Sequence, residues 1–236
     1  MTENIHQNTH HTNKRMGDKV ESSLRNMLPL TFGEEVGNSV THGVAALIFI
    51  FLLPFTAIYM YQTGGTLHAV GGSIFNISII FMLLSSTIYH VMAPNSTHKY
   101  VMRLLDHSFI FVAIAGSYTP IALSLIGGPF GWTVFGVQWA TAILGILYKV
   151  LSKNPSGKIS MLAYMVMGWT AVIIMPFIYD KISFAFVFFI ILGGVMYTIG
   201  AWFYAQKGRR YFHMIWHFFI ILASAFHYIA IVFYMI

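Results

Sequence analysis

Residues 38–61 read NSVTHGVAALIFIFLLPFTAIYMY and contain no Asp, Glu, Lys or Arg. An apolar helix of about 20 residues, rising 1.5 Å per residue, spans the ~30 Å hydrocarbon core of a bilayer. This stretch therefore predicts a membrane-spanning helix.

Six further apolar stretches of helix length follow, separated by the Gly, Pro, Asn and Ser residues typical of turns. The seven predicted spans cover residues 38–61, 68–92, 101–125, 129–150, 159–179, 182–206 and 211–236. Pro54, Pro120 and Pro176 fall inside spans and are expected to kink them. The expected fold class is an all-α membrane protein, with a seven-transmembrane-helix bundle over residues 31–236.

The composition of the chain agrees with this class. Of 236 residues, 57% are hydrophobic and only 8% are charged, whereas about a quarter of the residues of a soluble domain are charged. The chain contains no cysteine, which excludes disulfides, thiolate metal ligands and cysteine nucleophiles.

The basic residues predict the orientation in the membrane. Residues 1–30 are polar and lack the pattern of a signal peptide, so a mobile cytoplasmic tail is expected there. All but one (Lys181) of the 13 basic residues lie in this tail or beside the second, fourth and sixth connections. The positive-inside rule then places the N-terminus in the cytoplasm and the C-terminus outside. The net charge of +6 reflects topology and contact with anionic lipid heads, not a nucleic-acid partner.

Asp106 is the acidic residue placed to lie inside a span, about one turn into the third. An intramembrane acid is a functional-site candidate by default. The alternative is an ion pair with Arg103, which lies three residues earlier on the same helical face.

Three histidines are predicted to meet near the cytoplasmic end of the bundle. His90 ends the second span, while His213 and His217 begin the seventh with the i, i+4 spacing that suits two ligands of one metal. Because these spans run in opposite directions, all three imidazoles and Asp106 fall at similar depth. His227 lies about 15 Å deeper, too far for the same ion. The alternative is that these histidines only pack and hydrogen-bond to backbone carbonyls.

Three histidine ligands with water in the fourth position are the open arrangement of catalytic zinc sites. In that reading, Asp106 accepts or orients the proton of the water. Ser86, one turn before His90, hydrogen-bonds the water or a substrate oxygen. Glu35, Asn38 and His42 share one face of the first span and are expected to support the site from behind. Their alternative role is simply to begin that helix.

The combined motifs resemble the haemolysin III family, the bacterial members of the progestin and adipoQ receptor superfamily, over roughly residues 30–236. The motifs are Glu35-Val-Gly-Asn-Ser-Val-Thr-His42, Ser85-Ser-Thr-Ile-Tyr-His90, Asp106-His107, Ala115-Gly-Ser-Tyr-Thr-Pro120, and His213 and His217 with His227. The resemblance implies seven spans, a zinc site at His90, His213 and His217, a water-orienting Asp106 and a nearby Ser86. It also implies a link to membrane-lipid homeostasis and a relationship to alkaline ceramidases.

Two functional classes follow from these observations. The first is a Zn²⁺-dependent hydrolase of a membrane lipid amide or ester in the cell membrane, reached near the cytoplasmic leaflet. The second is a non-enzymatic membrane-stress sensor, channel or cytolytic protein with a structural zinc. The clustering of polar residues at the inner end, with apolar outer halves, counts against a simple channel.

Overall fold

The structure of the protein is a computed structural model that describes residues 30–152 and 155–235, and its regular elements are all helical. The predicted cytoplasmic tail falls on residues 1–29, outside the described part of the chain.

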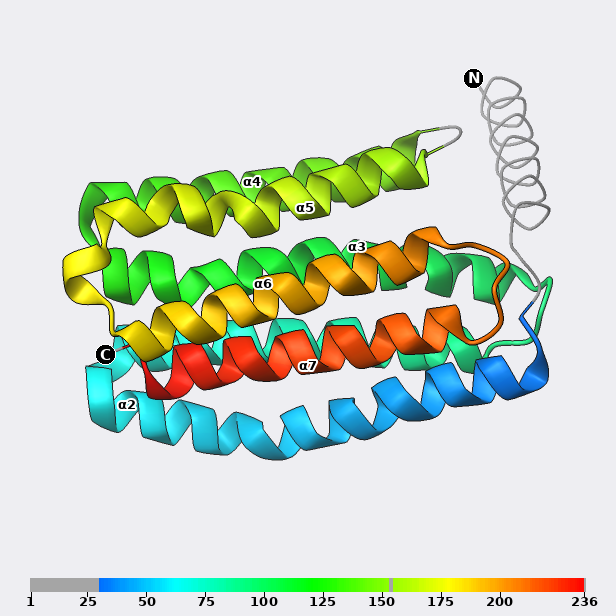
Figure 1. The fold of residues 1–236 in the computed structure, drawn as a ribbon, viewed down its shortest axis with the longest axis horizontal. Helices are drawn as coiled ribbons and strands as arrows, with labels where there is room; N and C mark the ends of the chain where they lie inside the picture. The colour runs from blue at the N-terminus through cyan, green and yellow to red at the C-terminus, as the bar shows by residue number, and fades with distance from the viewer. Residues whose placement is uncertain (1–29, 153–154, 236) are drawn as a thin grey trace, which may run out of the picture.

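The helices follow one another with short connections (Figure 1). They are α2 (Phe32–Val91), α3 (Thr97–Pro120), the π-helical turn η1 (Ile121–Ile126), α4 (Gly128–Leu151), α5 (Gly157–Ile174), the 3-10 turns η2 (Met175–Phe177) and η3 (Tyr179–Lys181), α6 (Phe184–Ala205) and α7 (Phe212–Phe233).

The 60-residue helix α2 is two arms joined at Gly65, whose φ of 76° and ψ of −167° are not helical. These angles lie in a region open essentially to glycine alone. The ribbon reverses direction there, and the two arms lie side by side (Figure 1). Hydrogen bonds from Ser39 to Thr87 and from Asn76 to Thr56 join the antiparallel arms. The first two predicted spans therefore form one element, and the predicted connection at 62–67 is helical except at Gly65.

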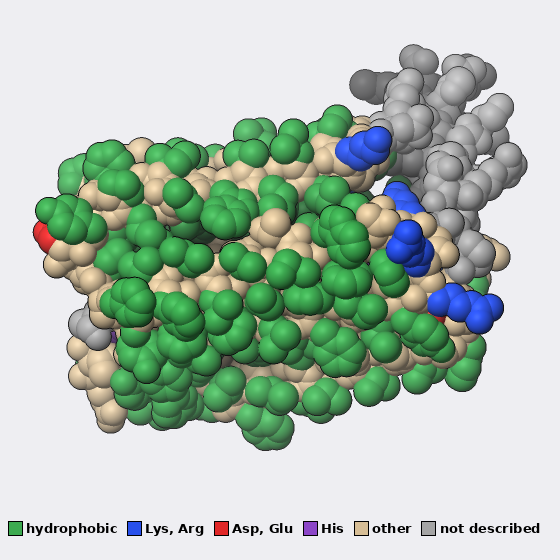
Figure 2. All heavy atoms as spheres, viewed as in Figure 1, with side chains coloured by type: hydrophobic (Ala, Val, Ile, Leu, Met, Phe, Trp, Pro, Cys, Tyr) green, Lys and Arg blue, Asp and Glu red, His purple; other side chains and the backbone are tan. Residues whose placement is uncertain are grey.

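Six described helices are long and apolar enough to cross a membrane: α2, α3 with η1, α4, α5 with η2, α6 and α7. In α4, α5 and α6, only 17–22% of the residues in the apolar 18-residue stretch are buried inside the bundle, whereas in α3 and α7 the share is 50%. Many of the exposed side chains of these helices are large and apolar, and Figure 2 shows the hydrophobic surface that they form on one side of the bundle. Such a surface is stable in lipid because the helices satisfy their own backbone polar groups.

The prolines predicted to kink spans have different effects. Pro120 ends α3, where the chain continues as the π-helical turn η1, and Pro176 lies in the 3-10 turn η2. At both positions the α-helix stops because proline supplies no N–H. α2 continues in helical conformation through Pro54.

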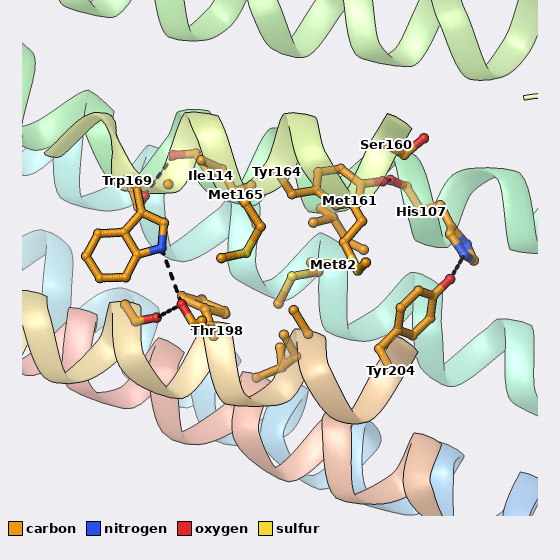
Figure 3. A pocket seen from close by; sticks show the side chains of 18 of the residues that line it. Met82, His107, Ile114, Ser160, Met161, Tyr164, Met165, Trp169, Thr198 and Tyr204 are labelled. Atoms are coloured by element: carbon orange, nitrogen blue, oxygen red, sulfur yellow. Dashed lines mark hydrogen bonds between the residues drawn. The ribbon is translucent and has the colours of Figure 1, made fainter. Parts of the chain in front are cut away.

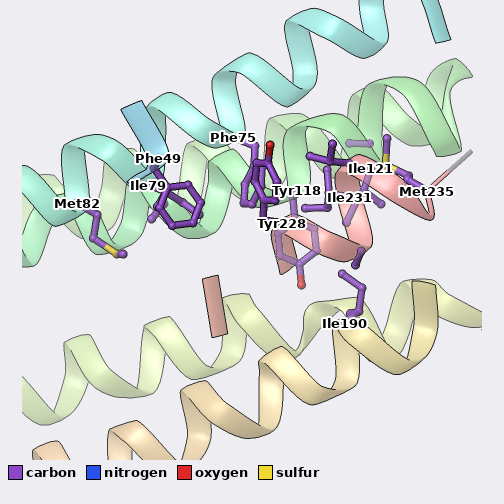
Figure 4. Packing of buried hydrophobic residues seen from close by; sticks show 14 of the residues in the cluster. Phe49, Phe75, Ile79, Met82, Tyr118, Ile121, Ile190, Tyr228, Ile231 and Met235 are labelled. Atoms are coloured by element: carbon purple, nitrogen blue, oxygen red, sulfur yellow. The ribbon is translucent and has the colours of Figure 1, made fainter. Parts of the chain in front are cut away.

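The hydrophobic core lies between both arms of α2, α3 and α7 (Figure 4). Phe49 and Phe75 pack against the ring of Tyr228 from the two arms. The Tyr228 hydroxyl lies 2.8 Å from Thr56 Oγ1, which also lies 3.2 Å from the side-chain amide of Asn76. This buried polar contact holds α7 in register with the two arms of α2, at the level of the core.

The start of α2 and the C-terminus lie at opposite ends of the bundle (Figure 1). Lys and Arg side chains gather at the end that carries the α6–α7 connection (Figure 2). The first turn of α2, the last turn of its second arm and the first turns of α7 meet at this same end. The predicted histidines His90, His213 and His217 lie together there, beside the start of α2.

Candidate metal centre

Two local features align α7 with the start of α2. Thr31 caps α2 through a capping box with Glu34, whose carboxylate accepts from the Thr31 backbone N–H at 2.9 Å. The second oxygen of Glu34 accepts from the backbone N–H of Tyr211 at 2.8 Å. Tyr211, which has a φ of 61°, is the N-cap residue that immediately precedes α7. Glu34 therefore positions the helix that carries His213 and His217, besides starting its own helix.

His90, His213 and His217 form a buried cluster whose ligand atoms all lie within 4.8 Å of one another. Nε2 of His213 is 3.2 Å from Nε2 of His90. Two nitrogens bound to one tetrahedral zinc, each at about 2.0–2.1 Å, lie roughly 3.3 Å apart. His90 is 3% exposed and His217 is 0% exposed, whereas His213 is partly exposed. The spacing of this pair therefore fits a shared metal ion.

The remaining ring nitrogens fix the tautomers. Nδ1 of His90 lies 2.6 Å from Glu35 Oε2, and Nδ1 of His217 lies 3.2 Å from the carbonyl oxygen of Asn38. Because a carboxylate and a carbonyl only accept, each Nδ1 carries the hydrogen and each Nε2 presents a lone pair. Nε2 of His217 is buried with no partner among the described residues. Such a group is costly unless something coordinates it, and a metal ion would supply that coordination.

The residues predicted to support the site from α2 touch the histidines. Glu35 accepts from His90, and its other oxygen accepts from Lys99 Nζ at 2.6 Å. Asn38 Nδ2 lies 3.5 Å from His90 Nδ1. The ring of His42 stacks on that of His217 at 3.6 Å between centroids and 8° between planes.

Asp106 and Ser86, the predicted catalytic residues, are buried at 4% and 1% exposure. Among the described residues, Asp106 pairs with His107 and not with Arg103; its Oδ2 is 3.3 Å from His107 Nδ1. The carboxylate lies within electrostatic range of His90 and His42. Ser86 Oγ has no hydrogen-bond partner in the described part of the chain, which leaves it available to a water or a substrate oxygen.

Two aromatic residues that sequence reasoning missed cover the cluster on one side. The ring of Trp216 lies 4.8 Å from that of His213 and 5.1 Å from that of His217. The ring centre of Tyr204 lies 4.8 Å from that of Trp216, and the Tyr204 hydroxyl lies 3.2 Å from Nε2 of His107. Trp216 stands between the two histidines in the sequence, but nothing in the sequence pairs Tyr204 with it.

A cavity of about 610 Å³ lies on the far side of these aromatics, between α3, α5, α6 and α7. Its lining includes Tyr204, Trp216 and His107, which also border the histidine cluster. Figure 3 shows Met161, Met165 and Trp169 of α5 in succession along the cavity, with Trp169 at the end away from His107 and Tyr204. The volume is in the range of pockets that bind small ligands.

Lys99 was also missed as a site residue. In the sequence, Lys99 served only as one of the basic residues that predict the orientation in the membrane. In the structure it is 4% exposed, and its ammonium also donates to the carbonyl of Met92 at 3.2 Å.

His227 is predicted to lie too deep for the ion, and its Nε2 lies 3.3 Å from the Ile190 carbonyl oxygen of α6. His68, in the second arm of α2, is buried, and its Nδ1 lies 3.0 Å from Ser124 Oγ.

Fold and site together define a multi-pass helical membrane protein with a buried histidine cluster suited to a metal ion. The sequence profile of the family described as Haemolysin-III related matches residues 30–228. The chain belongs to this family. It is therefore a multi-pass protein of the cell membrane.

Several relatives share most of their length with the chain. "Hemolysin-3 homolog" of Bacillus subtilis (strain 168) is 35% identical over 204 residues, which cover 86% of this chain and 95% of that protein. "Hemolysin-3" of Bacillus cereus is 32% identical, with 86% and 92% covered. The human "Monocyte to macrophage differentiation factor" is 23% identical, with 84% and 83% covered. No solved structure matches the chain.

Proposed function

We propose that the protein is a zinc-dependent hydrolase of a membrane lipid amide or ester, acting near the cytoplasmic leaflet in membrane-lipid homeostasis. The observation that carries the proposal is the buried Nε2 of His217, which has no partner among the described residues. It stands beside two imidazole nitrogens 3.2 Å apart. Imidazole donors suit zinc better than magnesium or calcium. His90, His213 and His217 would hold the ion.

When bound, zinc would polarise a substrate carbonyl and lower the pKa of a water toward ~7. The protein residues supply the other components. Asp106, buried and held against His107, would accept a proton from the water. Ser86, whose Oγ is unpartnered among the described residues, would donate a hydrogen bond to a substrate oxygen. Glu35 would hold the ring of His90, and Asn38 and His42 would hold that of His217.

The cavity supports a lipid as the substrate. Its lining is mainly apolar, it lies at membrane depth, and it reaches the aromatics that border the histidines. Helices α5 and α6 line it while making few close backbone approaches to each other. That sparse packing would let a chain enter sideways from the bilayer.

For the topology, we propose that each arm of α2 crosses the membrane, which makes seven crossings with the N-terminus in the cytoplasm and the C-terminus outside. Basic residues at the end that carries the metal centre support this orientation. Single cysteines can test it because the chain has none. A membrane-impermeant maleimide applied to intact cells should label Lys181→Cys and not Lys207→Cys; the reverse result would invert the topology.

The first experiment is metal content by elemental mass spectrometry on detergent-purified full-length protein. The parent should hold about one zinc per chain, and His217→Ala should lose it. His227→Ala is the control, because it removes another, partly buried imidazole of α7 that lies outside the cluster. Equal zinc in all three proteins, or none in the parent, would contradict the site.

The second experiment tests turnover. Asp106→Asn should keep zinc but lose at least about a hundredfold of the hydrolysis of lipid amides or esters, the scale of general acid–base catalysis. The alternative function, a cytolytic or sensing protein with a structural zinc, is favoured by the burial of His90 and His217 and by the names of the Bacillus relatives. Zinc binding without turnover in the parent would select that alternative.

A further inference from the structure

The cavity beside the metal centre has a basic end. Lys149, Arg103 and Lys207 line it there, from the last turn of α4, the start of α3 and the residues after α6. The opposite part, toward Trp169, is mainly apolar and includes Met165 (Figure 3). Among the described residues that line the cavity, none is an Asp or Glu. The lining thus combines a positive end with a long apolar tract.

Lys149 is the central residue of the basic end. Its side chain is only 6% exposed, and its ammonium lies 6.0 Å from the centre of the Tyr164 ring. Within residues 30–152 and 155–235, Lys149 has neither an ion pair with a carboxylate nor a side-chain hydrogen bond. The acid within electrostatic range is Asp106, which does not line the cavity and lies against His107.

Burying an ammonium without a counter-ion is unfavourable, and Lys149 also feels the like charge of Arg103. An anion in the cavity would remove this cost. The tract that continues from the basic end is apolar, so a small inorganic ion would leave most of the cavity without a partner. A molecule with an anionic head and a single hydrocarbon chain matches both parts.

We propose that this cavity binds a single-chain lipid with an anionic head, a carboxylate or a phosphate, that lies against Lys149 beside Arg103. This inference rests on the proposed function, which places the basic end of the cavity at the cytoplasmic side. It goes beyond that function by specifying that the ligand carries a negative charge. Tyr204 lines the cavity, and its ring lies 6.0 Å from that of His213. A lipid in the cavity would therefore reach the side of the histidine cluster.

Tryptophan quenching tests the proposal, because Trp169 and Trp216 line the cavity. The probe is a brominated stearate, and its methyl ester is the neutral control with the same chain. In detergent, the acid should quench the parent at concentrations at least about tenfold lower than the ester, since an ion pair at a buried site is worth a factor of ten or more. Equal quenching by acid and ester would overturn the proposal.

Three variants assign the effect to one residue. Lys149→Met keeps the length of the side chain and should abolish the preference for the acid, whereas Lys149→Arg should retain it. Lys158→Met removes an exposed lysine at the same end of the bundle, outside the cavity lining, and should behave as the parent. A preference for the acid that survives in Lys149→Met would overturn the assignment.

Two further measurements separate the ligand from the metal chemistry. Inorganic phosphate at equal concentration should not displace the brominated acid; displacement would identify a small-anion site and overturn the lipid as the ligand. His217→Ala should keep the preference for the acid after losing zinc. If the parent binds the acid selectively but has no hydrolytic activity, the proposed function fails while the ligand site stands.

Discussion

Replacing Glu35 by Gln should weaken zinc binding by about 10- to 100-fold, the usual effect of losing a residue that orients a metal ligand. The carboxylate accepts from His90 Nδ1 and from Lys99 Nζ, both at 2.6 Å. The neutral amide has one oxygen acceptor and no charge, so one of these contacts is lost and the other is weakened.

The structure supports the same magnitude by a second route. A hydrogen bond to a charged group contributes about 1.5–3 kcal/mol, and each ~1.4 kcal/mol is a factor of ten in affinity. Lys99 is 4% exposed, so its ammonium would also lose its buried counter-ion. Lys99→Met leaves the carboxylate on His90 and should therefore weaken binding less than Glu35→Gln. The double variant should lose less than the two separate losses combined, because both residues act through one contact network.

The assay is competition for zinc against a chelator of known affinity, on detergent-purified protein whose folding is checked by circular dichroism. Asp180→Asn is the control, because it neutralises a carboxylate in η3, at the end of the bundle opposite the histidines. Its zinc affinity should stay close to that of the parent. Parent-like zinc affinity in Glu35→Gln, or an equal loss in Asp180→Asn, would refute the orienting role of Glu35.

Two further predictions concern stability, each measured as the free energy of unfolding in detergent. Thr56→Val preserves shape but leaves the buried Tyr228 hydroxyl without its 2.8 Å partner, and should cost about 1–3 kcal/mol; no loss would mean that this contact is replaced locally. Gly65→Ala forces alanine into a backbone region that favours glycine and should cost about 1–3 kcal/mol, although nothing crowds the position. Gly136→Ala, within α4 and equally uncrowded, should cost nothing or stabilise slightly, because alanine is the better helix former; equal effects at the two glycines would contradict the backbone explanation.

Much of this site could be predicted from the sequence because its signals are local. The i, i+4 spacing of His213 and His217 places both on one helical face whatever surrounds them. The alternation of membrane spans then brings His90 to the same depth, and the structure places all three ligand atoms within 4.8 Å. Glu35, Asn38 and His42 were found in the same way, since a single helical face is a property of spacing.

The contacts missed were those between residues far apart in the chain. Lys99 had appeared only as a charge beside a connection, and its ion pair with Glu35 depends on how the second arm of α2 ends beside the first turn. The sequence also suggested Arg103 as a partner of Asp106, whereas its carboxylate lies against His107. Neighbours on one helix can be read from spacing, but the rotamer that a buried side chain adopts depends on the helices packed around it.

The sequence by itself determined that this chain is a membrane protein, where its apolar helices lie, and that its histidines gather at one depth. These properties follow from composition and helical periodicity, which act over short stretches of chain. Only the tertiary structure decided which nitrogen of each imidazole is available, what holds the rings, and that a cavity with a buried lysine lies behind Trp216 and Tyr204. Those properties arise where several helices meet, because burial and hydrogen-bond geometry are set by packing between distant segments.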